Sequence, residues 1–430
     1  MRAATLPRLQ ATNDSTAAPR GGRSPLATVF LTVFIDLLGF GIVIPLLPVY
    51  SKAYGASELS LGMLFASFSA IQFVFAPFWG RVSDRFGRRP VLIGGLLGTS
   101  LSYVLFGLAD SMGMLFASRL LAGFFGANVA TAQAYIADVT SPRERTKGMG
   151  LVGAAFGLGF TIGPLVGGEL AGVSMHAPGF FAAGLSLAAA IFGLARLREP
   201  ERHRAEASRL FGLQTVRFVT THGRVGGVLL LHFLAILAFG MFEAMFIRFG
   251  LARFPSVFRV PESIGSASVE QVLAAAPIAG RYMFAIGLVA AIIQGGLIRR
   301  LVPRFGEVRL IVAGPFLLGL SFLLIGLAPS WWVVILACVL MPMGFGVNNP
   351  SLNGLISRAS PGDRQGAVLG LNQSLASLAR VLGPLTAGAA FGAWGAGAPF
   401  LLGAGILLLA TLLAAAYSAR HGASFPHRAE

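Results

Sequence analysis

The chain has 430 residues, of which 55% are hydrophobic and only 12% are charged, and its formal net charge is +16. A soluble protein carries roughly 25% charged residues, so the composition excludes an ordinary soluble domain and indicates a protein that crosses a membrane many times. The basic residues lie in short loops between apolar runs, as cytoplasmic loops require, so the positive charge does not indicate nucleic-acid binding.

The chain begins with a polar, basic segment at 1–25, which we expect to be a disordered cytoplasmic tail. The apolar run that follows is too long for the core of a signal peptide, so it is expected to stay as the first helix. Runs long enough to span a bilayer then follow in two sets of six. The first six are expected at 27–50, 59–79, 90–109, 112–136, 148–172 and 178–196, and the second six at 226–249, 277–298, 308–328, 331–356, 366–390 and 396–418.

A charged segment at 198–225 divides these spans six and six. The sequence therefore predicts an all-α membrane protein with twelve transmembrane helices. They form one six-helix bundle at 26–197, a cytoplasmic linker at 198–225, a second bundle at 226–418 and a short cytoplasmic tail at 419–430. Lys and Arg concentrate in the loops on the side of both termini, which predicts a multi-pass protein of the cell (inner) membrane with both ends in the cytoplasm.

The two halves repeat one another, which predicts pseudo-symmetric bundles related by an axis along the membrane normal. A transport site would then lie between the bundles, near the midplane of the membrane. The landmarks that recur at an offset of 219 or 220 residues are Arg85-Phe86-Gly87 with Arg304-Phe305-Gly306, Gly163-Pro164 with Gly383-Pro384, and Gly126 and Asn128 with Gly346 and Asn348.

The loop "GRVSDRFGRRP" at 80–90 concentrates charge between two predicted spans. Gly80 is expected to end the second span tightly against a neighbour, and Gly87 to adopt a positive φ. Asp84 is an acid in a basic loop, and we expect it at a helix N-terminus or bound to an arginine. The functional interpretation is a conformational latch, and for the last two arginines the alternative is plain positive-inside charge. The latch residues are Gly80, Asp84, Arg85, Gly87, Arg88 and Arg89.

The predicted fifth span contains "GAAFGLGFTIGPLVGG" at 153–168. Three of its glycines lie four residues apart on one helical face, where they allow close approach of another helix, and its proline removes a backbone hydrogen bond. The segment is either ordinary helix packing or an interface that slides and seals. Its candidate residues, with their counterparts in the eleventh span, are Gly153, Gly157, Gly159, Gly163, Pro164, Gly167, Gly168, Gly383 and Pro384.

Ionisable side chains inside a membrane are candidates for function. Asp36 lies near the middle of the first span, where it would exchange a proton or form a hydrogen bond between helices. Arg119 is expected to pair with Asp36 or to line the cavity. Glu243 and Arg380 complete the proton-coupling candidates, although Glu243 is equally compatible with a wet vestibule. Spans 8 to 12 contain no carboxylate, and the lone His232 is interpreted as structural.

Uncharged polar residues and an aromatic residue in the spans are candidates for a substrate cavity, because ligand pockets combine apolar walls with a few polar anchors. As repeat mates, Asn128 and Asn348 are expected to face each other across this cavity. The set is Phe40, Gln72, Asn128, Gln133, Asn348, Asn349, Asn372 and Gln373.

Four segments resemble the major facilitator superfamily. The loop at 80–90 resembles its cytoplasmic loop motif, and "RLLAGFFGANVATAQAYIAD" at 119–138 its fourth-helix motif. The segment at 153–168 resembles its antiporter motif, and "FIDLLGFGIVIPLLP" at 34–48 is similar to the first helix of bacterial tetracycline and multidrug efflux proteins. The resemblance implies drug and proton exchange, with a role in proton coupling for Arg119.

The expected function is export of hydrophobic or amphipathic small molecules in exchange for protons by alternating access. The alternatives are a proton-coupled carrier of a metabolite such as a sugar or an organic acid, and a non-transporting sensor on the same scaffold. The sequence has no P-loop, catalytic triad or metal-ligand cluster, so we expect no enzyme, no metal and no cofactor besides the proton gradient. The expected partners are a small-molecule substrate, protons and the lipid bilayer, with no nucleic acid, and the protein is expected to be a monomer.

Overall fold

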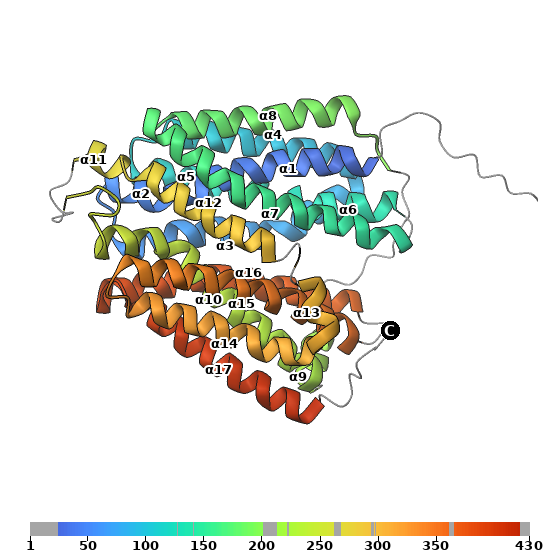
Figure 1. The fold of residues 1–430 in the computed structure, drawn as a ribbon. Coiled ribbons are helices and arrows are strands. Elements are labelled where there is room, and N and C mark those ends of the chain that lie inside the picture. The colour runs from blue at the N-terminus through green and yellow to red at the C-terminus, as the bar shows by residue number, and fades with distance from the viewer. Residues whose placement is uncertain are drawn as a thin grey trace, which may run out of the picture.

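The structure is a computed structural model that describes residues 25–126, 128–140, 142–200, 213–221, 223–261, 268–293, 296, 298–360 and 365–421. Within these ranges, all regular secondary structure is helical (Figure 1). Twelve helical stretches are long and apolar enough to cross a membrane, which confirms the predicted number of spans. The predicted tails lie mostly outside the described residues, as do residues 201–212 and 222 of the predicted linker.

The first half of the chain forms a bundle that ends at residue 196. Its helices are α1 (Pro25–Val43), the 3-10 turn η1 (Ile44–Leu46), α2 (Leu47–Ala53), α3 (Glu58–Phe86), α4 (Arg88–Gly107), α5 (Met112–Phe125), α6 (Asn128–Val139), α7 (Pro142–Val173) and α8 (Ala177–Arg196).

The second half forms the other bundle, which lies beside the first (Figure 1). Its helices are α9 (Leu213–Thr221), α10 (Gly223–Arg253), α11 (Val269–Leu273), α12 (Ala276–Ile292), α13 (Ile298–Phe305), α14 (Glu307–Gly326), α15 (Trp331–Ala359), α16 (Gln365–Trp394) and α17 (Ala398–His421). The short α9 lies in the segment predicted as linker.

The helices have two ends. We call the end that holds residues 80–90 and 298–309 the basic end, and the end that holds residues 54–57 and 254–261 the opposite end. At the basic end, Gly87 and Gly306 separate α3 from α4 and α13 from α14, with φ of 112° and 74°. The positive φ predicted for Gly87 is confirmed, and its repeat mate adopts the same turn.

The prediction that Gly80 ends the second span is wrong. α3 continues to Phe86, and nothing lies within 4 Å of the position that a Cβ on Gly80 would occupy. The reason is that helix α3 has a strong stop only at Gly87, where the left-handed backbone breaks the helical hydrogen-bond pattern.

The hydrophobic core shows how the bundles are joined. At the opposite end, a single cluster of buried side chains includes Leu47 and Leu61 of the first bundle together with Phe246 and Trp331 of the second. Toward the basic end, the core divides. One cluster, around Leu92, belongs to the first bundle alone, and clusters around Leu355 and Ala379 belong to the second. The bundles therefore pack together at the opposite end and separate toward the basic end.

The helical face of α3 that meets α16 shows the same separation. Gly62 and Ser69 on this face are buried, whereas Phe73, further along the same face, is 43% exposed. On α16, Pro384 and Gly388 are buried, and Gln373, closer to the basic end, is exposed. Residues eleven apart share a helical face, so these faces are in contact only near the opposite end.

Candidate functional site

Helices α7 and α12 meet at the opposite end through two glycines. A Cβ built on Gly168 would stand 2.6 Å from the carbonyl oxygen of Ala276 and 3.1 Å from the Cα of Gly280. A Cβ on Gly280 would overlap the carbonyl oxygen of Pro164. Only glycine allows backbones to approach this closely, so the segment predicted as an antiporter motif forms one of the contacts between the bundles.

Helices α3 and α16 meet in the same manner. A Cβ on Gly388 would stand 2.5 Å from the carbonyl oxygen of Glu58, and a Cβ on Gly62 would overlap the carbonyl oxygen of Pro384. Gly168 and Gly388 are repeat mates, as are Pro164 and Pro384. The opposite end is therefore closed by two crossings related by the internal repeat.

Two ion pairs join the bundles beside these crossings. Arg248 of α10 donates to the carboxylate of Glu58 on α3 at 2.8 Å, and its side chain is only 3% exposed. Arg281 of α12 donates to Glu169 of α7 at 2.7 Å, and its side chain is 63% exposed. The sequence analysis did not single out either acid, although each lies at the end of an apolar span.

The other glycines of the fifth span pack within the first bundle. Cβ atoms on Gly159, Gly163 and Gly167 would all meet the backbone of α1, between Leu37 and Ile42. The prediction that these three glycines share one close-packed face is confirmed. Gly153 and Gly157 have open space around their Cβ positions. In the second bundle, Gly383 packs in the same way on Gly240 of α10.

Asp36 is buried inside the first bundle, on α1. Its Oδ2 accepts a hydrogen bond of 3.2 Å from the side-chain amide of Asn128, which also lies 3.4 Å from the Thr99 hydroxyl. Oδ1 of Asp36 has no partner in hydrogen-bonding geometry among the described residues, although the Ser186 hydroxyl is close enough to interact with the carboxylate. One carboxylate oxygen is therefore available inside the membrane span to hold a proton.

Arg119 neither pairs with Asp36 nor lines a cavity in this conformation, so both expectations for it are wrong. Its side chain is fully buried, and none of its three guanidinium nitrogens has a hydrogen-bond partner within the described part of the chain. The guanidinium lies instead 6.0 Å from the ring centroid of Phe68 and 5.9 Å from that of Phe106. Asp36 is hydrogen-bonded to Asn128 and not to Arg119. The guanidinium of Arg119 is stabilised instead by the faces of Phe68 and Phe106.

The fourth span is broken between α5 and α6, next to Asn128. The break frees backbone carbonyls that a continuous helix would use, and two side chains of α3 satisfy them. The indole of Trp79 donates to Phe124 O at 2.5 Å, and the amide of Gln72 donates to Gly126 O at 2.6 Å. Gln72, predicted to line the cavity, therefore stabilises the helix break.

Aromatic side chains gather between α1, α3 and α7. The ring of Phe40 lies 5.2 Å from that of Phe68 and 5.5 Å from that of Phe160, which in turn packs against Phe156. The predicted cavity residue Phe40 is thus the centre of an apolar aromatic group. Because Phe160 and Arg380 are repeat mates, the second bundle carries a cation where the first carries this aromatic surface.

The second bundle contains a polar network around His232 on α10. The Nδ1 atom of His232 lies 2.7 Å from Asn372 Oδ1 on α16, and its Nε2 atom lies 3.1 Å from Asn349 Oδ1 on α15. Arg380 interacts electrostatically with both His232 and Glu243. His232 is therefore joined to two predicted cavity residues, and Arg380 is the one predicted proton-coupling residue of this bundle that interacts with it.

Asn128 and Asn348 do not face each other across the cavity, contrary to expectation. A Cβ on Gly95 of α4 would overlap Asn128, and a Cβ on Gly314 of α14 would stand 2.6 Å from the Cβ of Asn348. Gly95 and Gly314 are themselves repeat mates, so each asparagine packs against a glycine inside its own bundle. Gln133 and Gln373 are both exposed.

The charged loop at the basic end is centred on Arg88. Its guanidinium donates to Asp84 at 2.6 Å, to Asp138 of α6 at 3.0 Å and to the Ser83 hydroxyl at 3.1 Å. Asp84 lies in the last turn of α3, so the expected arginine partner is confirmed and the expected helix N-terminus is wrong. Asp138 is the last residue of the segment at 119–138, and nothing in the sequence indicates that it binds Arg88.

Glu199 caps the N-terminus of α4. Its carboxylate accepts hydrogen bonds from the backbone N–H groups of Arg88 and Arg89 at 2.7 and 3.0 Å. The Arg89 side chain donates to Leu194 O at 2.7 Å, and Arg85 lies over the ring of Phe86. These described contacts of the latch residues stay within the first bundle and the segment directly after α8. The described residues contain no group of three metal ligands.

Known proteins are similar to this chain in sequence and in structure. The tetracycline resistance protein, class C, of Escherichia coli is 31% identical over 397 residues, covering 89% of this chain and 94% of its own length. Multidrug resistance protein 1 of Bacillus subtilis (strain 168) is 34% identical over 369 residues, covering 85% of this chain and 89% of its own. The crystal structure of the human organic anion transporter MFSD10 (TETRAN) is similar with a TM-score of 0.66 at 28% identity, covering 90% of this chain and 98% of its own.

The family model described as Major Facilitator Superfamily matches residues 29–303 and 263–426, and so takes in both bundles. The chain belongs to the Major Facilitator Superfamily of membrane transporters.

Proposed function

We propose that this transporter exports hydrophobic and amphipathic small molecules in exchange for protons by alternating access. The proposal agrees with the names of the relatives, which include tetracycline and multidrug resistance proteins. Transporters built from two parallel repeats work by rocking one bundle against the other around a central site. The two glycine crossings supply contacts between the bundles that can separate in such a motion.

The distribution of charge supports an orientation with the basic end in the cytoplasm. With that orientation, the conformation described above is closed toward the outside and separated toward the cytoplasm. It would admit a substrate from the cytoplasm or from the inner leaflet of the membrane, as an exporter requires. The latch residues around Arg88 would then lie on the cytoplasmic side, where their partners are free to change as the bundles rock.

The observation that carries the proton-coupling proposal is the half-satisfied carboxylate of Asp36. A charged acid inside a membrane is costly unless it is paired, and Asp36 has no cation bound to it among the described residues. Protonation would remove the charge and let the free oxygen act as a donor. Asn128 is the first residue of α6, directly after the helix break, and it binds Asp36 of α1. Protonation of Asp36 would therefore change the contact between α1 and the fourth span.

The substrate would lie between the aromatic group of the first bundle and the polar network of the second. Phe40 and Phe160 offer apolar surface, and Asn349 and Gln373 offer hydrogen-bonding groups. A site with large apolar walls and few polar anchors suits amphipathic molecules. Glu243 would serve as a second proton acceptor or as a partner for a cationic substrate group.

The alternative with a specific observation in its favour is a proton-coupled carrier of an organic acid. Arg380 interacts electrostatically with His232, which contacts two asparagines, and a guanidinium near such polar groups can bind a carboxylate. The similar human structure is named an organic anion transporter. A non-transporting sensor would use the same site without flux.

The test uses everted membrane vesicles with an imposed proton gradient reported by a pH-sensitive dye. Lipophilic cations, tetracycline and aromatic carboxylates are added in turn, and proton release is recorded as dequenching. We expect release with lipophilic compounds in the wild-type protein, no release with Asp36→Asn, and wild-type release with Asp110→Asn, which removes an exposed loop acid.

Three outcomes would contradict the proposal in whole or in part. A response to carboxylates alone favours the organic acid carrier. A response that Asp36→Asn retains at matched expression contradicts the role of Asp36. Binding of a panel compound to the purified protein without any proton or substrate flux favours the sensor.

A further inference from the structure

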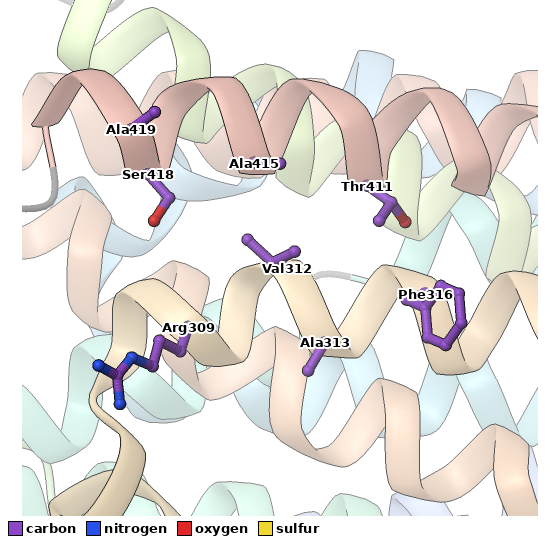
Figure 2. Close-up of a pocket in the computed structure, with 8 residues that line it drawn as sticks. All are labelled: Arg309, Val312, Ala313, Phe316, Thr411, Ala415, Ser418 and Ala419. Carbon is purple, nitrogen blue, oxygen red and sulfur yellow. The ribbon is translucent and has the colours of Figure 1, made fainter.

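A groove lies on the outer side of the second bundle, between α14 and α17, at the basic end (Figure 2). Its volume is about 560 Å³. The walls are formed by Val312, Ala313 and Phe316 of α14 and by Thr411, Ala415 and Ser418 of α17. The groove exists because small residues, chiefly the alanines, occupy positions where larger side chains would fill the space between the two helices.

The groove faces the membrane and not the transport site. Figure 1 shows α14 and α17 in the part of the second bundle that lies farthest from the first. Both helices carry large exposed apolar side chains, including Phe316 at 55% exposure and Leu408 at 57%. Such side chains belong against lipid in a protein of this family, so hydrocarbon is the medium that fills an apolar groove on this surface.

One end of the groove is charged. Arg309, in the first turn of α14, lies at the same end as Ser418 and Ala419 (Figure 2). Arg309 is exposed, and Arg420 follows Ala419 directly. This end coincides with the basic end of the bundle, where the helices leave the apolar region. The groove therefore combines apolar walls with a cationic group, Arg309, at the level of the lipid headgroups.

We propose that this groove binds one anionic phospholipid, with an acyl chain between α14 and α17 and the phosphate on Arg309. A guanidinium forms paired hydrogen bonds with phosphate oxygens. Basic pockets between transmembrane helices at the cytoplasmic side are suited to anionic headgroups. A net negative lipid is preferred over phosphatidylcholine, because the choline ammonium cancels the attraction to the arginine.

The repeat supplies a comparison within the molecule. The position equivalent to Arg309 in the first bundle is Pro90, and the neighbouring α4 arginines are engaged: Arg88 binds two acids, and Arg89 binds a backbone carbonyl. The first turn of α4 therefore has no free cation at the position of Arg309, and the exposed arginine of this face is Arg196 at the end of α8. The arrangement with a cation in the first turn of the helix is expected on the second bundle.

The experiment measures lipid retention by native mass spectrometry of the purified full-length protein, titrated with phosphatidylglycerol and, separately, with phosphatidylcholine. We expect one phosphatidylglycerol to be retained preferentially. Loss of one cation near the surface is worth about a fivefold change in affinity, so Arg309→Gln should lower retention about fivefold, and Arg309→Lys by less. Arg253→Gln, which removes a charge at the opposite end, should have no effect.

A second pair of variants tests the groove itself. Ala415→Leu would fill it, whereas Ala416→Leu adds the same volume to an exposed neighbour outside the lining. We expect only Ala415→Leu to reduce phosphatidylglycerol retention, with monodisperse elution for both. Equal retention of the two lipids, equal effects of Arg309→Gln and Arg253→Gln, an ineffective Ala415→Leu, or dimer formation in place of lipid retention would each overturn the proposal.

Discussion

Gly168 of α7 and Gly280 of α12 lie so close that a Cβ on Gly168 would stand 3.1 Å from the Cα of Gly280. The contact is made by backbone alone, and so is its counterpart between Gly388 and the α3 backbone at Glu58. The glycines themselves leave no side chain without a partner when the helices part, whereas the flanking ion pairs Arg281–Glu169 and Arg248–Glu58 have to separate. A crossing of this kind can form and separate repeatedly during a transport cycle.

The first prediction concerns this crossing. Gly280→Ala places a methyl group against Pro164 O and forces α7 and α12 apart. Overpacking of this kind costs about 1–3 kcal/mol, which would lower the population closed at the opposite end by roughly five- to a hundredfold. Spin labels on Val173 and Glu270 should report a longer distance, and transport should fall.

The control for this prediction is Gly184→Ala on α8, where nothing lies within 4 Å of the added methyl group. Its label distances and transport rate should match those of the wild-type protein. If Gly280→Ala behaves in the same way as Gly184→Ala, the crossing does not govern the closed state.

The second prediction compares the two ion pairs between the bundles. Glu58→Gln leaves the buried Arg248 guanidinium without its counter-ion, and removing one partner of a buried pair costs about 3 kcal/mol. Glu169→Gln affects a solvent-exposed pair, which is worth far less. We expect a lower thermal unfolding midpoint for Glu58→Gln than for Glu169→Gln in the same detergent. Equal midpoints would show that the buried ion pair stabilises the protein no more than the exposed one.

The third prediction concerns the latch. Asp84→Asn and Asp138→Asn each remove one acid from Arg88, and a hydrogen bond to a charged group is worth about 1.5–3 kcal/mol when shielded. Since Asp138 is 26% exposed and Asp84 is 66% exposed, the loss should be greater for Asp138→Asn. The loss of transport would be measured as the initial rate of proton-coupled flux at matched expression, with Asp110→Asn as the control. Wild-type rates for both variants would refute the latch.

The fourth prediction concerns His232. His232→Leu leaves the side-chain oxygen of the buried Asn372 without its partner, and an unsatisfied buried polar group costs about 1–3 kcal/mol. The side-chain oxygen of Asn349 still accepts a hydrogen bond from Asn353. His232→Gln can still bond to one of the two asparagines, so it should unfold at a temperature between those of the wild type and the leucine variant. A leucine variant as stable as the wild type would show that the network contributes nothing to the bundle.

Much of the fold was predictable because bilayer thickness fixes the length of an apolar span. The twelve spans and the positive φ of Gly87 follow from that length and from the chemistry of glycine. The face shared by Gly159, Gly163 and Gly167 follows from helical periodicity alone.

The partners of individual side chains were less predictable. Periodicity places Asn128 on a helical face but does not identify the helix opposite, so the sequence did not reveal that it binds Asp36 and packs on Gly95. The helix break at Gly126 exposes the carbonyl that Gln72 binds, and the hydropathy of the sequence does not indicate this break. The partners of Arg248 and Arg281 lie more than a hundred residues away, and only the packing of the bundles brings them together.

The unequal exposure of the two ion pairs at the opposite end has a mechanical consequence. Dissolved salt weakens attraction between charges that water reaches and leaves shielded charges nearly unaffected. Arg281, which is 63% exposed, therefore binds Glu169 less firmly as ionic strength rises, while Arg248 keeps Glu58. As ionic strength rises, the α7–α12 side should therefore lose its ion pair before the α3–α16 side does.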